Sequence, residues 1–204
     1  MTNVCCIVEG AGEVAALPVL LRRIHDWLTP ALPFPRILAP IKVARDRFLN
    51  RPDEFSRHAL LAAAKCGDDG WILLLLDADD DCPARLGADL VARLGAAVPH
   101  RRSGVVLANR EFEAWFIAAA ASLAGCRGFQ LGPQPVPPAE TPRDAKGWVN
   151  ERMPRRAYGP TTDQPALAAK IDLRMAHANS RSFRKLTSEW LRHMGADPAA
   201  ETAA

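Results

Sequence analysis

The sequence lacks the features of a membrane-spanning, secreted or disulfide-bonded protein. None of its apolar runs reaches the roughly 18 residues that a membrane-spanning helix needs, and it does not open with the charged and apolar regions of a secretory signal. Its five cysteines are odd in number, and Cys5 and Cys6 lie within an apolar, strand-like segment. Neither a disulfide framework nor a CxxC metal site is therefore indicated. We expect a soluble, cytoplasmic protein with reduced thiols and no membrane partner.

Several catalytic and nucleotide-binding motifs are also missing. No glycine is followed by Lys-Ser or Lys-Thr, which excludes a Walker A loop, so any ATP-driven step would need another chain. The five histidines show no HExxH or Cys/His spacing, which argues against a zinc site. The net charge of +3 is modest, and affinity for nucleic acid would have to come from local clusters of basic residues.

The most informative stretch is an uninterrupted apolar run, residues 71–76, which is followed by four aspartates within residues 77–81. A short apolar run bounded by glycine and proline is typical of a strand buried on both faces of a parallel sheet. Carboxylates at the carboxyl end of such a strand lie where open α/β sheets bind ligands. Because closely spaced aspartates repel one another and raise one another's pKa values, the cluster predicts a divalent cation between the side chains.

Strand-like segments alternate with helical patterns through the first 124 residues. The expected strands are residues 3–8, 36–43, 71–76 and 104–108. The expected helices are residues 14–28, 53–65, 83–94 and 109–123. Pro40 would confine the second strand to a sheet edge or shorten it. This alternation predicts parallel βαβ units and an α/β fold with a parallel sheet flanked by helices.

The composition changes after the last of these helices. Residues 125–160 are rich in proline and glycine, which predicts a linker or long loop. Helical periodicity returns in residues 163–178 and 182–194. We therefore expect an α/β domain at residues 1–124 and a small helical C-terminal extension at residues 161–196.

Acidic residues follow three of the expected strands. Glu9 comes directly after the first strand, Asp77 and Asp79 follow the central one, and Glu111 and Glu113 follow the last. Because the carboxyl ends of neighbouring parallel strands meet at one edge of a sheet, these carboxylates are expected to converge. Such oxygen ligands suit one or two magnesium ions, which keep water positions free for a phosphate substrate.

The order of these motifs resembles a known fold. Residues 8–13 (VEGAGE) before a helix, with a later apolar strand ending in residues 77–79 (DAD), are similar to the Toprim domain of topoisomerases, primase and the overcoming-lysogenisation-defect nucleases. With residues 109–116, 158–164 and 180–186 added, nearly the whole chain resembles a Toprim-like bacterial family catalogued as domain of unknown function 4276.

The resemblance implies metal-dependent phosphoryl transfer on nucleic acid. It makes Glu9 a general acid or base, assigns Asp77 and Asp79 to Mg²⁺ or Mn²⁺, and adds Glu113 as a further acidic ligand. Topoisomerases also need a tyrosine nucleophile, and the single tyrosine, Tyr158, lies in the proline-rich segment, which favours hydrolysis over strand passage. We therefore expect a metal-dependent nuclease or nicking enzyme.

Some of the acidic residues also have a structural interpretation. Asp80 and Asp81 suit a helix N-cap and its neighbour before Pro83. Glu111 and Glu113 suit the first turn of a helix, where acidic residues are common without a function. The sequence leaves open whether Glu111, Asp80 or Asp81 belongs to the site.

Three other functions are compatible with parts of the sequence. Residues 10–15 (GAGEVA) match the glycine pattern of dinucleotide-binding folds, although Glu9 would place a negative charge against the pyrophosphate. Small-molecule phosphatases of the haloacid-dehalogenase type also place Asp-x-Asp after an apolar strand, but Asp81 stands where they have threonine or valine. The chain could also be a non-catalytic Toprim-fold subunit that regulates or binds a partner ATPase in phage defence or DNA repair.

Basic residues gather in two segments that could contact nucleic acid. One lies in the proline-rich segment near Trp148 and Tyr158, whose rings could stack on an unpaired base, and the other lies in the last expected helix. The candidates are Arg143, Lys146, Arg152, Arg155, Arg156, Arg184 and Lys185. Charge-rich segments are often only solvated, so these side chains could equally face water.

Overall fold

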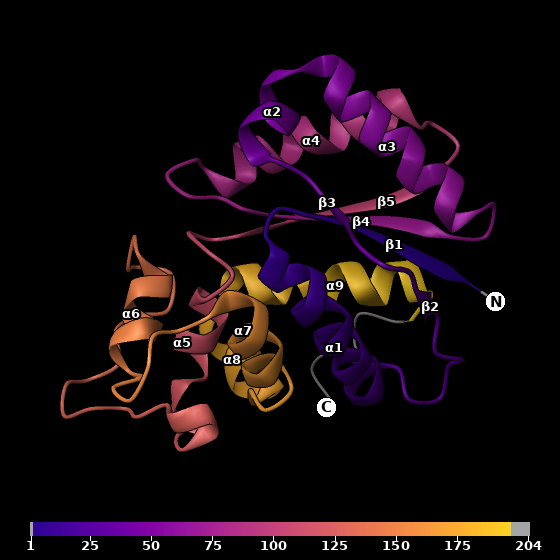
Figure 1. Cartoon of the computed structure of the whole chain (residues 1–204). Coiled ribbons are helices and arrows are strands. Elements are labelled where there is room, and N and C mark those ends of the chain that lie inside the picture. Colours follow the sequence, from indigo (N-terminus) through magenta and orange to yellow (C-terminus); the bar gives the residue numbers. More distant parts are fainter. Residues whose placement is uncertain (1, 197–204) are drawn as a thin grey trace.

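The structure, a computed structural model, describes residues 2–196, and a parallel sheet lies at its centre (Figure 1). The strands are β1 (Asn3–Val8), β2 (Arg36–Ile37), β3 (Ile41–Lys42), β4 (Trp71–Asp77) and β5 (Arg102–Ala108). Their order is β2-β1-β4-β5. Strand β3 also pairs with β1: β2 lies along the start of β1, and β3 lies along its end. Every pairing is parallel, which confirms the predicted α/β class.

The edge of the sheet beside β1 is interrupted at Pro40. The sequence predicts one strand over residues 36–43, and the structure has two strands of two residues each, β2 and β3. Proline has no backbone N–H to donate and is tolerated in sheets only at edges and breaks. The predicted edge position is confirmed, and the single long strand is not.

Helices cover both faces of the sheet, as Figure 1 shows. One face carries α2 (Arg45–Asn50), α3 (Pro52–Cys66) and α4 (Pro83–Ala97). The other face carries α1 (Ala11–Leu28), α7 (Pro160–Ala168), α8 (Leu173–Asn179) and α9 (Arg181–Met194). The short elements α5 (Ala114–Ala118), η1 (Ala120–Leu123), η2 (Cys126–Gly128) and α6 (Ala145–Glu151) extend this second layer.

Strand β4 explains the uninterrupted apolar run of the sequence. Residues 71, 73 and 75 belong to the core cluster beneath α1 and α9, whereas residues 72, 74 and 76 belong to the cluster beneath α2, α3 and α4. Successive side chains of a strand point to opposite faces, and here both faces are covered. The strand therefore needs apolar residues at consecutive positions, and it ends at the first aspartate, Asp77.

Two expected helices are shorter than the sequence suggested. Arg110 has a left-handed backbone (φ 70°), so no helix begins at residue 109, and α5 and η1 replace the helix expected over residues 109–123. The helix expected over residues 163–178 is divided into α7 and α8. The division falls at Asp172, whose side chain accepts the N–H of Met175 at 2.9 Å and so begins a new helix.

The segment after residue 124 packs into the main core. Residues 125–160, expected to be a linker, contain η2 and α6, and Phe129, Val149 and Tyr158 are buried in the cluster that α1 also lines. Helix α9 lies across the sheet beside β5 (Figure 1). Apolar residues spaced through the proline-rich segment thus hold it against the helices. In the part of the chain that the structure describes, no helix is both long enough and apolar enough to cross a membrane.

Candidate active site

A cavity of about 430 Å³ lies at the carboxyl edge of β1 and β4, and we call it the carboxylate pocket. Its walls come from the loop after β1, the first turn of α1, the ends of β4 and β5, and the starts of α6 and α7. The lining residues are Glu9, Gly10, Ala11, Gly12, Glu13, Asp77, Asp79, Glu111, Glu113, Lys146, Pro160 and Thr161. The structure therefore brings together the four acidic residues expected at the site, together with Glu111.

The geometry of the sheet explains this convergence. Val8, the last residue of β1, pairs with Leu75 of β4, so Glu9 and Asp77 leave adjacent strands at nearly the same level. Asp77 in turn pairs with Ala108, the last residue of β5. The ends of three neighbouring parallel strands thus deliver their acidic residues to one edge, the usual ligand position of open α/β sheets.

Asp77, at the end of β4, has a pKa that its surroundings in the pocket raise. Its Oδ1 accepts the backbone N–H of Phe112 at 2.8 Å, which ties the end of β4 to the segment after β5. Burial raises the pKa of Asp77 well above its usual value. The carboxylates of Glu13, Glu113 and Glu9 raise this pKa further, and the hydrogen bond from Phe112 acts in the opposite direction. Such crowding of negative charge favours a bound cation or a shared proton.

Glu9 has the pKa expected of a proton-transfer group. Burial first, and then the charge of Asp79, raises the pKa of Glu9 to about 7, while Arg45 acts to lower it. Within the described residues, the buried Oε2 atom of Glu9 has no hydrogen-bond partner. A carboxyl group with a pKa near neutrality can both accept and release a proton at physiological pH.

Glu113 is buried, with 4% of its surface exposed, and its pKa is raised to about 7, mainly by burial. The nearby hydroxyl of Tyr158 acts to lower this pKa, although it makes no hydrogen bond of good geometry within the described chain. The charges of Glu111 and Glu13 act to raise it. Burial raises the pKa of Tyr158 as well, which keeps its hydroxyl protonated and makes it a poor nucleophile.

Arg45, near the start of α2, is a site residue that the sequence did not reveal. Its Nε lies 3.9 Å from Glu9 Oε2 and 3.4 Å from Asp79 Oδ2, and its Nη2 lies 2.6 Å from Asp81 Oδ2. Arg45 also donates a hydrogen bond of 3.1 Å to the backbone oxygen of Asp77. It supplies positive charge beside the pocket and ties Asp81 into an ion pair. No motif around Arg45 signals this role, because α2 reaches the pocket only through the sheet topology.

Glu13 is a second residue that the sequence did not assign to the site. It is buried in the first turn of α1, and its Oε1 accepts a hydrogen bond from Gln164 Nε2 at 3.2 Å. Its Oε2 has no hydrogen-bond partner among the described residues. Its position four residues after Glu9 was the available signal, but an acidic residue in a first helical turn has an ordinary role there.

The carboxylate oxygens that line the pocket are chemically suited to a hard divalent cation. Carboxylate oxygens are the ligands that Mg²⁺ and Mn²⁺ prefer, and one buried oxygen each of Glu9 and Glu13 lacks a hydrogen-bond partner among the described residues. In residues 2–196 no group of three or more acidic, histidine or cysteine side chains stands ready to hold a metal ion. Mg²⁺ is usually bound through one or two carboxylates, with water and substrate phosphate completing the shell, so a cation at this pocket would not need three protein ligands.

Three of the basic residues expected to contact nucleic acid lie on the surface. Lys146 is exposed and lines the carboxylate pocket, where its backbone N–H donates to Glu111 Oε2 at 2.8 Å. Arg143 is 77% exposed, and its Nε lies 3.4 Å from Asp80 Oδ1. Arg155 is also exposed. All three side chains are accessible to a ligand, although Arg143 would have to leave Asp80 to pair with it.

Two other candidates in the same segment have contacts inside the fold. Arg152 lies over the ring of Trp148, with its guanidinium carbon 3.5 Å from the ring centroid. Arg156 pairs with the buried carboxylate of Asp163, and its Nη1 donates to Asp163 Oδ2 at 2.7 Å. Arg152 therefore packs on α6, and Arg156 ties the segment between α6 and α7 to α7.

The two candidates on α9 also have structural partners. Arg184 donates to the backbone oxygen of His177 at 2.7 Å, near the end of α8. Lys185 pairs with Glu189 on its own helix at 2.5 Å. Arg184 therefore links α9 to α8, Lys185 pairs within α9, and any contact with nucleic acid would have to displace these partners.

The fold and the pocket together define an α/β protein whose parallel sheet has a carboxylate-lined cavity at its carboxyl edge. Comparison with protein-family models matches residues 8–191 to the family described as Domain of unknown function (DUF4276). The match spans the pocket and the C-terminal helices, and the protein belongs to this family. The same comparison with curated proteins and with solved structures finds no match.

Proposed function

We propose that the protein is a metal-dependent nuclease or nicking enzyme that hydrolyses nucleic acid phosphodiesters, with a Toprim-like arrangement of its acidic residues. The proposal rests on the convergence of Glu9, Asp77, Asp79 and Glu113 on one pocket. A glutamate after one strand and an Asp-x-Asp sequence after the adjacent parallel strand is also the order of motifs in the Toprim domain, to which the sequence is similar.

The residues divide the work of hydrolysis between them. Asp77 and Asp79 would hold Mg²⁺ or Mn²⁺, which when bound polarises a phosphoryl oxygen and stabilises the charge of the leaving group. Glu9, with a pKa of about 7, would accept the proton of the attacking water. Lys146 at the wall of the pocket offers a positive charge to a neighbouring phosphate.

The contacts of Arg45 favour one second candidate, a non-catalytic subunit. Arg45 neutralises part of the charge of Asp79 and Asp81 by direct contact. A protein that had kept the fold and lost the reaction would be stabilised by such a pairing. Because the sequence has no Walker A loop, this subunit would act on a separate partner, such as an ATPase in phage defence or DNA repair.

Cleavage assays distinguish these candidates. Supercoiled plasmid, single-stranded DNA and RNA are incubated with the protein and Mg²⁺ or Mn²⁺, alongside Glu9→Gln and Asp77→Asn. We expect nicked or cleaved products that disappear on chelation and fall by about 10² to 10⁴-fold in each variant. Asp89→Asn, which alters an exposed carboxylate on α4, is the matched control and keeps full activity. Cleavage that persists in both pocket variants, or no cleavage with any metal and nucleic acid, contradicts the nuclease proposal.

A further inference from the structure

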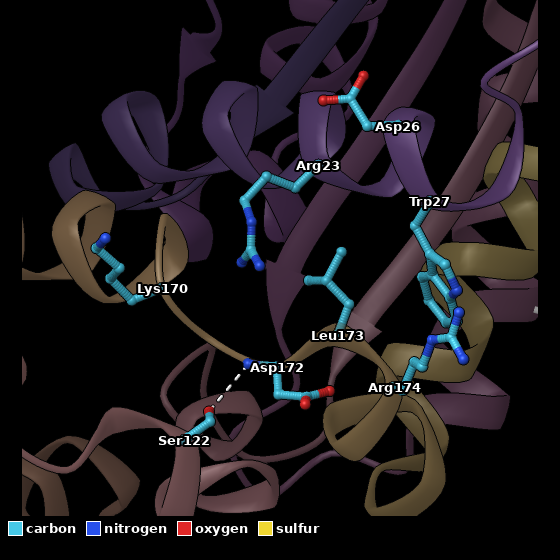
Figure 2. Close-up of a pocket in the computed structure, with 8 residues that line it drawn as sticks. All are labelled: Arg23, Asp26, Trp27, Ser122, Lys170, Asp172, Leu173 and Arg174. Carbon is cyan, nitrogen blue, oxygen red and sulfur yellow. Dashed lines mark hydrogen bonds between the residues drawn. The ribbon is translucent and has the colours of Figure 1, made fainter.

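A second cavity, of about 580 Å³, lies between the last turns of α1, the start of α8 and the segment that joins α7 to α8 (Figure 2). It shares no lining residue with the carboxylate pocket. Its lining residues are Arg23, Asp26, Trp27, Ser122, Lys170, Asp172, Leu173 and Arg174. We call it the basic cavity, because three of these side chains carry a permanent or nearly permanent positive charge.

Arg23 is the fixed cation of the basic cavity. Its Nη1 donates to the backbone oxygens of Ala168 at 2.9 Å and Ile171 at 2.6 Å, at the end of α7. In Figure 2 its guanidinium group points from α1 into the space between the helices. Among the described residues its other guanidinium nitrogens make no hydrogen bond, so they present N–H groups to the cavity in a set orientation. Such a preorganised fork suits the oxygens of a phosphate group.

Two further cations at the basic cavity have no acidic partner. Lys170 and Arg174 are exposed, and neither has an ion-pair partner within 4.0 Å in the part of the chain that is described. Asp26 does not offset them, because in Figure 2 its carboxylate points away from Arg23. Asp172 is the one carboxylate that remains; its negative charge acts on Arg23, and its Oδ1 accepts the N–H of Met175. Positive charge therefore exceeds negative charge at this surface.

We propose that the basic cavity binds the phosphate group of a nucleotide, with Arg23 contacting the phosphate, Lys170 and Arg174 adding positive charge on either side of it, and Trp27 lying beside the base. The indole of Trp27 forms one wall in Figure 2. Aromatic rings beside cationic side chains are the usual elements of nucleotide and single-strand recognition. The cavity is wide open to solvent, and its volume of about 580 Å³ leaves room for a nucleotide. The proposal does not depend on the nuclease proposal, because the two cavities have separate residues.

Calorimetric titration tests the proposal, with EDTA present so that metal-dependent binding at the carboxylate pocket does not contribute. The probes are AMP, a five-residue oligothymidylate and inorganic phosphate. The test variant is Lys170→Gln with Arg174→Gln, which removes two exposed charges and leaves the buried contacts of Arg23 intact. The control variant is Arg36→Gln with Arg51→Gln, two exposed arginines whose loss changes the net charge equally.

We expect one binding site per chain, an affinity about tenfold or more lower in the test variant, and no change in the control. Binding of AMP identifies a free nucleotide as sufficient, and binding of the oligothymidylate alone identifies a nucleotide within a strand. Trp27→Leu should weaken nucleotide binding but not phosphate binding, which also reports that the variant is folded. Equal affinities in the test and control variants, or no binding at about 10 mM of any probe, overturn the proposal. Phosphate binding as tight as AMP binding overturns the nucleotide assignment.

Discussion

Gln164 of α7 donates a hydrogen bond of 3.2 Å to Glu13 of α1, across 151 positions of the sequence. Both side chains are buried, and Glu13 Oε2 and Gln164 Oε1 have no further partner among the described residues. Buried polar atoms without partners are costly, so this pair depends on close contact between α1 and α7. The contact also closes one side of the carboxylate pocket, because both helices begin at its wall.

The close approach of α1 and α7 predicts that Gly12→Ala destabilises the protein. A Cβ at Gly12 would overlap Gln164 Oε1 and lie 3.1 Å from the Cβ of Pro160. We expect a loss of about 1 to 3 kcal/mol in the free energy of unfolding, measured by urea denaturation. Gly95→Ala on α4 is the control, since its Cβ would meet no atom within 4 Å and alanine favours a helix by up to about 1 kcal/mol. Equal effects of the two substitutions would contradict this packing.

The sequence predicts the parts of the site that depend on local pattern. The apolar run and the positions of Glu9, Asp77 and Asp79 are set by strand periodicity and by the ends of strands, so they could be read in order along the chain. Arg45 and Gln164 could not be found in this way, because they contact the acidic residues of the pocket only where the fold brings together segments far apart in sequence. The prediction of a helix beginning at residue 109 was wrong, because no local sequence signal indicates the left-handed backbone of Arg110.

The order of the proline-rich segment, residues 125–160, also depends on contacts that local sequence does not reveal. Glu140 makes several of these contacts. Glu140 Oε1 accepts hydrogen bonds of 2.8 Å from Ser180 Oγ, Ser182 Oγ and the N–H of Ser182, and its Oε2 accepts one of 3.1 Å from Asn109. Burial acts to raise the pKa of Glu140, but these hydrogen bonds hold it below its usual value. One carboxylate thus links the segment to the start of α9 and to the end of β5.

Glu140→Ala is therefore expected to destabilise the protein by about 2 to 4 kcal/mol, because it leaves several buried donors without an acceptor. Thermal and urea denaturation give this difference. Glu151→Ala is the control, since Glu151 is 76% exposed and its nearest cation, Arg152, is 3.8 Å away. That substitution should change stability by less than about 0.5 kcal/mol. A small effect at Glu140 would mean that the segment is held by its apolar residues alone.

The hydrogen bonds of Asp163 predict that the protein loses stability at acidic pH. Hydrogen bonds from Arg156, followed by those from Gly159 and Arg127, overcome burial and lower the pKa of Asp163 to about 2. Because the folded-state pKa lies below the ordinary value of 3.8, the stabilisation is fully present above about pH 4 and is lost as the pH falls through about 2. Asp163→Asn should cost about 2 kcal/mol at pH 7, since both arginines are partly exposed.

Urea denaturation of the wild type and Asp163→Asn between pH 4 and pH 2 tests the direction of this pH dependence. The difference between wild type and Asp163→Asn should narrow as the pH is lowered from 4 towards 2. Asp68→Asn is the control, because its carboxylate is fully exposed beside Arg101 and should change stability by less than about 1 kcal/mol at any pH. A difference that stayed constant or grew on acidification would show that the charge of Asp163 is not what stabilises this contact.

A measurement of metal binding separates the catalytic proposal from the non-catalytic one. It has to be made on the wild type and on Arg45→Gln, because Arg45 contacts Asp79. If Asp77 and Asp79 hold Mn²⁺, the melting temperature should rise by about 5 to 10 °C at a concentration about 100-fold above the dissociation constant. Asp77→Asn should abolish the rise, and Asp89→Asn should keep it.

Because Arg45 competes for the charge of Asp79, Arg45→Gln should lower the melting temperature in EDTA and enlarge the Mn²⁺-dependent rise. A rise in Arg45→Gln but not in the wild type would mean that Arg45 has taken the place of the cation, as the non-catalytic candidate requires. No rise in either protein would contradict a metal site at this pocket.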